Sequence, residues 1–525
     1  PIKASEWQNA STRPIEAGEI DRLIAKELQA SGIRPAPRTT DEQFVRRIYL
    51  DLTGRLPPPV DISAFVASKD PAKRAKLIDK LLDSDDYATH WAHFWRDVMS
   101  ARLTDFRGRA LTRSFEGWLV EQLKKNRGWD RIVHDLLTAE GEGRFDDTGK
   151  TGYVFFLGSH NGADAANELA AETSRVFLGI QINCAQCHDH PYDQWKREQF
   201  HELAAYFARS RQRLVRDSES NRFVGIAIVQ NNFRGEHRMP SKDNPRTGTV
   251  VHPKFLDGKA PGRNLGDKQR RNNLADAVTA KSNYWFSGAF VNRVWGELMG
   301  QSFYLPVDDM GPQKEAMFGP VLTRLAGSFR GTEYDIKALF RAMLNSNTYQ
   351  RQTRLGESPG DHLQFAALYP TRLRADALWD SLTGVLGRMG PGGGGPPRRG
   401  PGGGGPFGGG FGLERQFKEE FRFDPSLKSD DIEGSISQAL ILMNNPQINQ
   451  RLGATGATVL GRILSSNTSD EEALQAVYLR ALARKPTDRE KQKCLSYIKK
   501  VGNQAEAFED ILWALINSTE FQTKR

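Results

Sequence analysis

Apolar residues recur at helical spacing along most of this chain, and this pattern constrains its fold more than any other feature. Ile20, Ile24 and Leu28 fall on one helical face, and similar patterns occupy residues 112–139 and most of 270–346 and 434–516. Residues 87–98 carry an aromatic stripe at helical spacing, which is typical of a buried core. The sequence therefore predicts a mainly α-helical protein.

Two stretches depart from the helical pattern. Residues 223–229 and 249–251 are the best strand candidates, so we expect a small β element around 211–262. Residues 390–412 hold 14 Gly and 5 Pro among 23 positions, a composition that predicts a disordered loop. The length of 525 residues exceeds what a single core supports. We expect two domains, an N-terminal helical domain over 15–210 and a C-terminal helical domain over 263–525, joined by the β-containing connector 211–262.

Composition limits the classes of partner. The net charge is +9, but the basic residues are mixed with 64 acidic ones and accompany no helix-turn-helix, finger or RNA-binding signature, so we expect no nucleic-acid partner. No apolar run is long enough to span a membrane in the sequence given. The start at Pro1, with no initiator Met, is expected of a mature or trimmed chain.

One short motif carries specific chemistry. The chain has only three cysteines, and two of them stand in the run Cys184-Ala-Gln-Cys187-His188. Thiols at this spacing can form thioethers to the two vinyl groups of a porphyrin, and the adjacent His then ligates the iron. The motif predicts one covalent haem c held by Cys184 and Cys187, with His188 as a ligand of the haem iron. Covalent haem implies assembly outside the cytoplasm, so we expect an exported protein, periplasmic or at the cell surface.

Two other readings of the motif stay open. A structural zinc ion could use the two thiols with His188 or His190 and a distant residue. A plain disulfide or a thioredoxin-like redox pair could use the thiols alone, although that pair needs a βα context and a helix is expected before the motif.

The second axial ligand of such a haem is less constrained by the sequence. Candidates are one of two methionines or four histidines, namely Met310, Met239, His160, His201, His237 and His252. We select Met310, because it sits beside the paired carboxylates Asp308 and Asp309. Those carboxylates could shape a turn or cap a helix beginning near Lys314, bind calcium, or act in acid/base chemistry.

Several segments together resemble a known pair of domains. The stretch 177–197 around the cysteines, the stretch 50–58 and the stretch 91–95 resemble a planctomycete domain family named for its association with cytochrome c. From about residue 255 the chain is similar to the partner domain that usually follows, with Val291-Asn-Arg-Val-Trp295 and Pro306-Val-Asp-Asp309 among its marks. Relatives often continue the second motif with a Phe and a His-containing run, whereas this chain continues with Met310-Gly-Pro.

The resemblance implies a secreted redox protein of unsettled activity. It implies association with an external cytochrome c or another redox partner, and catabolism of an extracellular carbohydrate such as a polysaccharide. The leading hypothesis is therefore a haem oxidoreductase or the electron-transfer subunit of one; whether it is itself an enzyme the sequence leaves open. The alternative is a non-enzymatic scaffold that binds a glycan or a protein and uses the motif as a structural zinc or disulfide site.

Overall fold

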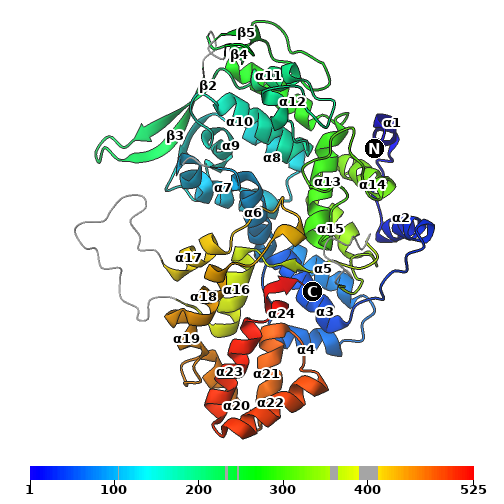
Figure 1. Ribbon diagram of the computed structural model, residues 1–525, viewed down its shortest axis with the longest axis vertical. Coiled ribbons are helices and arrows are strands. Elements are labelled where there is room, and N and C mark those ends of the chain that lie inside the picture. Colours follow the sequence, from blue (N-terminus) through cyan, green and yellow to red (C-terminus); the bar gives the residue numbers. More distant parts are fainter. Residues whose placement is uncertain (104–105, 231–233, 245–246, 355–364, 390–411, 525) are drawn as a thin grey trace. The chain divides into compact units, whose positions relative to one another are not determined.

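The computed structural model describes residues 1–524 except 104–105, 231–233, 245–246, 355–364 and 390–411. Within these residues the chain forms 24 α-helices and three small antiparallel sheets (Figure 1). The expected helical fold class with a small β element is confirmed. The disordered loop expected at 390–412 lies, apart from Gly412, outside the described residues.

The chain divides into two compact units, each drawn from several stretches of sequence. Unit 1 comprises Pro1–Arg34, Trp91–Tyr349 and Asp424–Lys428, and unit 2 comprises Pro35–His90, Gln350–Phe423 and Ser429–Arg525. Helix α6 (Asp85–Ser100) passes from unit 2 into unit 1 after His90. The domain ranges 15–210, 211–262 and 263–525 expected from the sequence remain a prediction.

Unit 1 holds eleven further α-helices among its described residues: α1 (Ala4–Asn9), α2 (Ala17–Ala30), α7 (Phe106–Lys124), α8 (Trp129–Thr138), α9 (Phe155–Gly158), α10 (Ala165–Glu172), α11 (Arg197–Ala204), α12 (Asp267–Thr279), α13 (Tyr284–Met299), α14 (Gly319–Gly331) and α15 (Ile336–Leu344). Short 3-10 turns lie at Gly152–Val154 and Asn183–Gln186, and α10 runs directly into a π-helical segment, Thr173–Leu178. The aromatic stripe of α6 lies in the core as expected, with the Trp95 ring 4.2 Å from Trp129 and 5.3 Å from Phe290 between centroids.

The β element of unit 1 consists of two sheets. Strand β3 (Phe223–Gln230) pairs with β1 (Gly141–Arg144) on one side and β2 (Ser210–Arg216) on the other, and β4 (His237–Pro240) pairs with β5 (Gly248–Val251). Both strand candidates of the sequence, 223–229 and 249–251, are strands.

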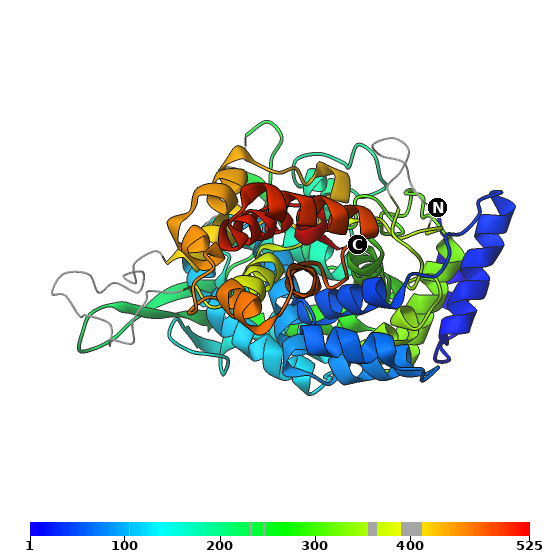
Figure 2. The same ribbon diagram turned by 90° about the horizontal axis from the view of Figure 1, so that it is seen from below.

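Unit 2 is a helical bundle with its own apolar core around Trp379, Phe417 and Phe508. Its helices among the described residues are α3 (Asp41–Thr53), α4 (Pro59–Ala67), α5 (Lys73–Leu82), α16 (Ala375–Leu386), α17 (Leu413–Glu420), α18 (Ile436–Asn444), α19 (Pro446–Leu452), α20 (Val459–Ser466), α21 (Asp470–Leu482), α22 (Asp488–Val501), α23 (Gln504–Ile516) and α24 (Thr519–Gln522), with a 3-10 turn at Ser429–Asp431. Strands β6 (Thr371–Arg372) and β7 (Thr523–Lys524) pair, and α21, α22 and α23 pack together in the orange and red part of Figure 2.

Candidate functional site

The cysteine motif lies on an exposed turn of unit 1. Asn183–Gln186 form a single 3-10 turn, in which the Ala185 N–H donates to the Ile182 carbonyl at 2.9 Å. Ile182 and Ala185 are buried, whereas Cys184 and Cys187 are exposed free thiols. The alternation of buried and exposed residues anchors the turn and leaves both sulfur atoms at the surface.

His188 follows the thiols with one ring nitrogen fixed. Its Nδ1 lies 2.7 Å from the backbone carbonyl of Asp189, and a carbonyl can only accept, so Nδ1 carries the proton. In the neutral ring Nε2 then carries the lone pair, and it has no hydrogen-bond partner among the described residues. An imidazole whose Nδ1–H is held by a carbonyl is the usual form of an iron-ligating His. The donor set of Cys184, Cys187 and His188 therefore fits covalent haem.

The loop after His188 is held by its own hydrogen bonds. The Asp189 carboxylate accepts from the Arg197 N–H and from Lys196 Nζ, each at 3.0 Å. The backbone bond from Arg197, followed by the Lys196 side chain, holds the pKa of Asp189 below its usual range. The His190 N–H donates to the Trp195 carbonyl at 2.8 Å, which closes the loop 190–195.

His201 and His237 support the cysteine turn through a chain of hydrogen bonds. His201 Nε2 lies 3.0 Å from the carbonyl of Gln186, between the two cysteines, and so donates to it. His201 Nδ1 must then accept, and it does so from His237 Nε2 at 2.8 Å. Burial, and then the charge that His201 would carry, lower the pKa of His237 to about 4, and burial also lowers the pKa of His201. Both rings are therefore neutral at neutral pH, as this chain of bonds requires.

The segment with the paired carboxylates is joined to the cysteine segment on both sides. Before the motif, the Met310 N–H donates to the Gly179 carbonyl at 2.7 Å and Gln181 Nε2 donates to Asp308 Oδ1 at 2.6 Å. After the motif, Gly311 lies so close to the Asp193 carboxylate that a Cβ would stand 1.6 Å from Oδ2. The bond between Gln181 and Asp308 was not predicted from the sequence, because the two residues are 127 positions apart.

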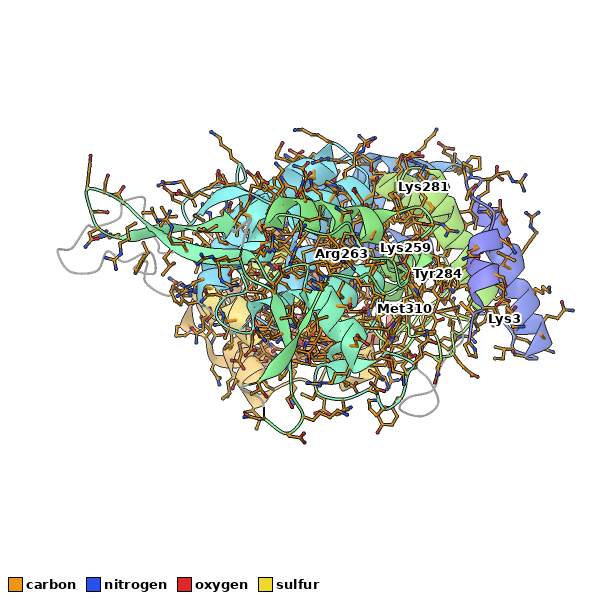
Figure 3. The ribbon with its side chains drawn as sticks, turned by 90° about the horizontal axis from the view of Figure 1, so that it is seen from above. Lys3, Lys259, Arg263, Lys281, Tyr284 and Met310 are labelled. Carbon is orange, nitrogen blue, oxygen red and sulfur yellow. The ribbon has the colours of Figure 1, made fainter. Side chains whose placement is uncertain are left out.

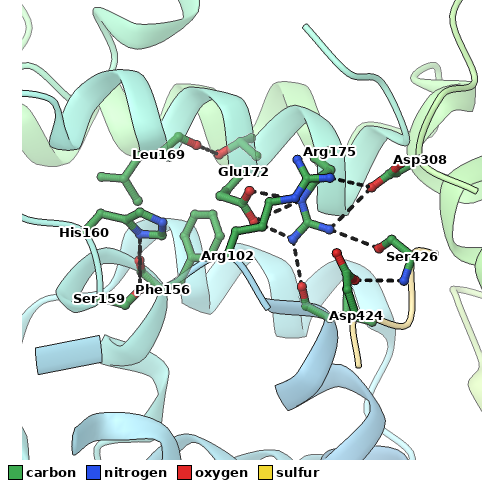
Figure 4. Close-up of polar contacts among 12 residues, drawn as sticks. Arg102, Phe156, Ser159, His160, Leu169, Glu172, Arg175, Asp308, Asp424 and Ser426 are labelled. Atoms are coloured by element: carbon green, nitrogen blue, oxygen red, sulfur yellow. Dashed lines mark hydrogen bonds and ion pairs between the residues drawn. The ribbon is translucent and has the colours of Figure 1, made fainter. Parts of the chain in front are cut away.

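Asp308 belongs to a buried ionic network (Figure 4). It lies 3.5 Å from the buried Arg175 and 3.6 Å from Arg102, while Arg175 also binds Glu172 at 2.6 Å. Burial pushes the pKa of Asp308 up, but Arg293 and Arg175 outweigh burial and hold it below its usual range. Asp308 is thus a permanent buried anion.

The two carboxylates shape a turn, as one of the sequence readings allowed, and do not cap a helix near Lys314. The Asp309 N–H donates to the Pro306 carbonyl at 3.1 Å, the Asp309 carboxylate pairs with Lys314 at 3.0 Å, and the next helix, α14, begins only at Gly319.

A cavity of about 620 Å³ opens beside this network and beside the cysteine turn. Its lining includes Cys184, His160, Arg102, Glu172 and Asn167, so one of the two motif cysteines lines it. A volume of this size is within the range of small-molecule and cofactor sites.

His160 lines this cavity, and its ring carries a proton on Nδ1, as the ring of His188 does. Its Nδ1 lies 3.1 Å from the Phe156 carbonyl and 3.1 Å from Ser159 Oγ, so Nδ1 is protonated (Figure 4). Nε2 is left as a lone pair with no hydrogen-bond partner in the described part of the chain. The His160 side chain is buried, so its ring orientation is set by packing.

Met310, selected from the sequence as the second axial ligand, lies in the core. Its side chain is completely buried, and its sulfur would stand 2.7 Å from a Cβ placed on Gly179. It does not line the cavity that contains Cys184. Of the other candidates, Met239 lies in β4 and His252 is exposed, 3.9 Å from Glu236. The role of Met310 as a ligand stays a prediction.

The zinc reading would need the thiols and further ligands to form one cluster. Among the described residues, no group of three or more His, Cys, Asp or Glu side chains is arranged to hold a metal ion. The third cysteine, Cys494, belongs to unit 2, where its sulfur lies 3.8 Å from the Tyr478 hydroxyl.

Comparison with known proteins identifies two domains. Residues 19–212 match the family model PSCyt2, described as a protein of unknown function (DUF1549), and residues 270–404 match PSD1, likewise of unknown function (DUF1553). No curated protein matches the chain, and no solved structure does. The helices of the described residues include none with the length and apolar character needed to cross a membrane. The two matches together cover more than half of the chain and confirm the resemblance drawn from the motifs. The chain belongs to the two-domain family in which a cytochrome-c-associated PSCyt2 domain of unknown function precedes a PSD1 domain.

Proposed function

We propose that this protein is an exported c-type haem protein that carries one haem on Cys184 and Cys187, with His188 as an axial ligand. The observation that carries the proposal is the state of His188. Its Nδ1–H is bound by the Asp189 carbonyl and its Nε2 is free, directly beside two exposed free thiols. The same arrangement does not favour zinc, which would need ligands that the described residues do not bring to the thiols.

The redox role follows from the cofactor and from the family. A haem held here would supply one-electron chemistry, with a potential set by its axial ligands and surroundings. The family name, which points to association with cytochrome c, supports an external cytochrome c as the electron partner. We propose an oxidoreductase, or the electron-transfer subunit of one, that acts outside the cytoplasm on extracellular catabolic substrates.

Intact mass spectrometry tests the attachment. Protein produced with haem-maturation machinery and then denatured should exceed the polypeptide mass by about 616 Da, one haem. The double variant Cys184→Ala/Cys187→Ala should lose the added mass, and the control Cys494→Ser should keep it. A bare-chain mass from a matured preparation would refute the proposal, and a native mass with one zinc ion would support the structural reading instead.

For the second axial position we propose His160 in place of Met310. His160 lines the same cavity as Cys184 and presents an unprotonated Nε2, whereas the Met310 sulfur is packed against Gly179. Ferric protein should show a low-spin spectrum without the weak sulfur–iron band at about 695 nm. His160→Ala should change it to high spin, and the near-isosteric Met310→Leu should leave it unchanged. The reverse result would assign Met310.

A further inference from the structure

A second cavity in unit 1, of about 590 Å³, has a different chemistry from the first. Aromatic side chains and neutral amides dominate its lining, among them Trp195, Tyr284, Trp285, Gln194, Gln199 and Asn283. Tyr284 and the lining residue Lys259 are labelled in Figure 3, together with Lys281, which directly precedes the lining residue Ser282. None of these residues belongs to the proposed haem site.

The aromatic side chains form a supported platform. Tyr284 and Trp285 are part-exposed at the start of α13, and their ring centroids are 4.9 Å apart. The completely buried Trp7 stacks on Tyr284 at 5.3 Å with an angle of 13° between the rings. Packing against Trp7 fixes the Tyr284 ring, so that a ligand would contact a rigid apolar surface.

Hydrogen-bonding groups are left over at the same cavity. Trp195 is 4 % exposed, and its Nε1–H is buried with no partner among the described residues. Asn283 donates through Nδ2 to the carbonyls of Ala277 and Val278, and Gln199 accepts at Oε1 from the Lys196 N–H. The Asn283 oxygen and the Gln199 amino group therefore remain as an acceptor and a donor. These two groups belong to part-exposed side chains of the lining, whereas the Trp195 N–H is closed off from the surface.

The charge of the lining excludes an ionic ligand. Asp257 and Lys259 are its only charged residues among those described, and they pair with each other at 2.9 Å. A phosphate ester or an organic acid would need an excess of cationic donors here. The lining instead fits a neutral molecule with apolar faces and several hydroxyl groups that donate and accept. A sugar ring has these properties, since its C–H face can lie on an aromatic ring while its hydroxyls reach the side-chain amides.

We infer that this cavity binds a short neutral saccharide, with Trp285 and Tyr284 as the stacking platform and the Gln199 amino group as a hydrogen-bond donor. The lining residue Trp195 ends the loop closed by the His190–Trp195 backbone bond, seven residues after His188. The saccharide site therefore lies one short loop away from the proposed haem ligand in the chain, although binding at it does not depend on haem.

Calorimetric titration of the full chain with neutral trisaccharides tests the inference. The probes are the β-1,4-glucose, β-1,3-glucose, α-1,4-glucose, β-1,4-xylose and β-1,4-mannose trimers. At least one should bind with a Kd below about 10 mM. Trp285→Ala should abolish binding. Gln199→Glu keeps the oxygen that accepts from the Lys196 N–H but removes the amino donor, and should weaken binding about tenfold.

Lys281→Ala is the matched control, because Lys281 is exposed beside the cavity and does not line it. It should leave the affinity unchanged. Absence of binding by all five trimers, or binding that both Trp285→Ala and Gln199→Glu leave intact, would overturn the inference. The titration is run on protein with and without haem attachment, so a failed haem proposal and a failed saccharide site give different results. Thermal unfolding of each variant identifies any that do not fold, in which case Gln199→Glu, the milder change, decides.

Discussion

Asp308 and Asp309 are neighbours in the chain but occupy opposite environments. The Asp308 side chain is 1 % exposed and faces Arg175, Arg102 and Gln181, whereas Asp309 is partly exposed and pairs with Lys314. A buried charge that loses its partner stays desolvated, while a surface pair contributes little. The two residues are therefore a matched pair for testing the network.

Asp308→Ala should destabilise the protein by about 3–5 kcal/mol, because it removes one of the carboxylates that balance the buried Arg175 and Arg293. Asp309→Ala should cost less than about 1 kcal/mol. Urea unfolding followed by tryptophan fluorescence measures both. Equal effects of the two substitutions would mean that the ionic network does not stabilise unit 1.

The π-helical segment Thr173–Leu178 sets the position of the cysteine turn. It ends at Gly179, whose backbone adopts a left-handed conformation (φ 67°) and whose N–H donates to the Ser174 carbonyl. π-helical turns are rare and often lie at functional sites. Here the wider turn carries Arg175 into the buried network and delivers the chain to Cys184 within a few residues.

Gly179→Ala tests how tightly this element is held. A left-handed backbone costs a non-glycine residue about 1–2 kcal/mol, and the new Cβ would also stand 2.7 Å from the Met310 sulfur. Gly32 is the control, since it is also left-handed (φ 69°) but has nothing within 4 Å of a Cβ. Gly179→Ala should lower the melting temperature more than Gly32→Ala, as differential scanning calorimetry would show. If the two shifts are equal, the contact with Met310 is not tight.

What could be predicted from the sequence was the local part of the structure. The helices and the strand at 223–229 depend on neighbouring residues, and they are present. The cysteine motif is also local, so its candidate chemistry could be stated in advance. The partners of Asp308 and the support of Gln186 by His201 and His237 were not predictable, because they join distant positions through folding. Met310 was selected by its place in the chain, which says nothing of the core that surrounds its sulfur.

On the scale of the whole molecule, the two family domains build the candidate site together. Gln181 lies in the PSCyt2 match and Asp308 in the PSD1 match, and both belong to unit 1. Arg175 and Arg293 of the ionic network likewise come from one match each. The match boundaries therefore do not separate independent sites.

A fragment of residues 1–262 should consequently not fold as the full chain does. It would retain Arg175 and Glu172 but lose Asp308, and it would lose α13, which packs against the π-helical segment. Near-ultraviolet circular dichroism should show no fixed tryptophan environment for this fragment. A fragment with a native-like spectrum and a cooperative melting transition would contradict the prediction.

Both units should lose stability in acid, and unit 1 should begin to do so at a higher pH. In unit 1, burial raises the pKa of Glu116, but His93 and Arg96 outweigh burial and hold this pKa at about 2. In unit 2, Arg484 holds the pKa of Glu490 at about 2. Their stabilisation is complete above the ordinary value of 4.5 and is lost as the pH falls toward 2. His237, whose pKa falls from 6.5 to about 4, adds a loss between those two values, because the unfolded chain gains the proton first.

Melting temperatures between pH 8 and pH 2.5 measure these losses. The wild-type curve should be flat above pH 7, fall gently to pH 4 and fall steeply below it. His237→Gln keeps an N–H donor but cannot titrate, so it should reduce the gentle part and leave the steep part unchanged. A melting temperature that rises between pH 7 and pH 5 would contradict the assignment of neutral His201 and His237.

The exposure of both thiols on a turn that is already anchored bears on the order of events in biogenesis. Ile182 and Ala185 fix the turn from inside, whereas the two cysteines are exposed and take no part in the buried core. Completion of the fold and chemical modification of the cysteines are therefore separable in time. An enzyme that modifies this pair can recognise a finished surface, and an error in modification leaves a folded protein behind.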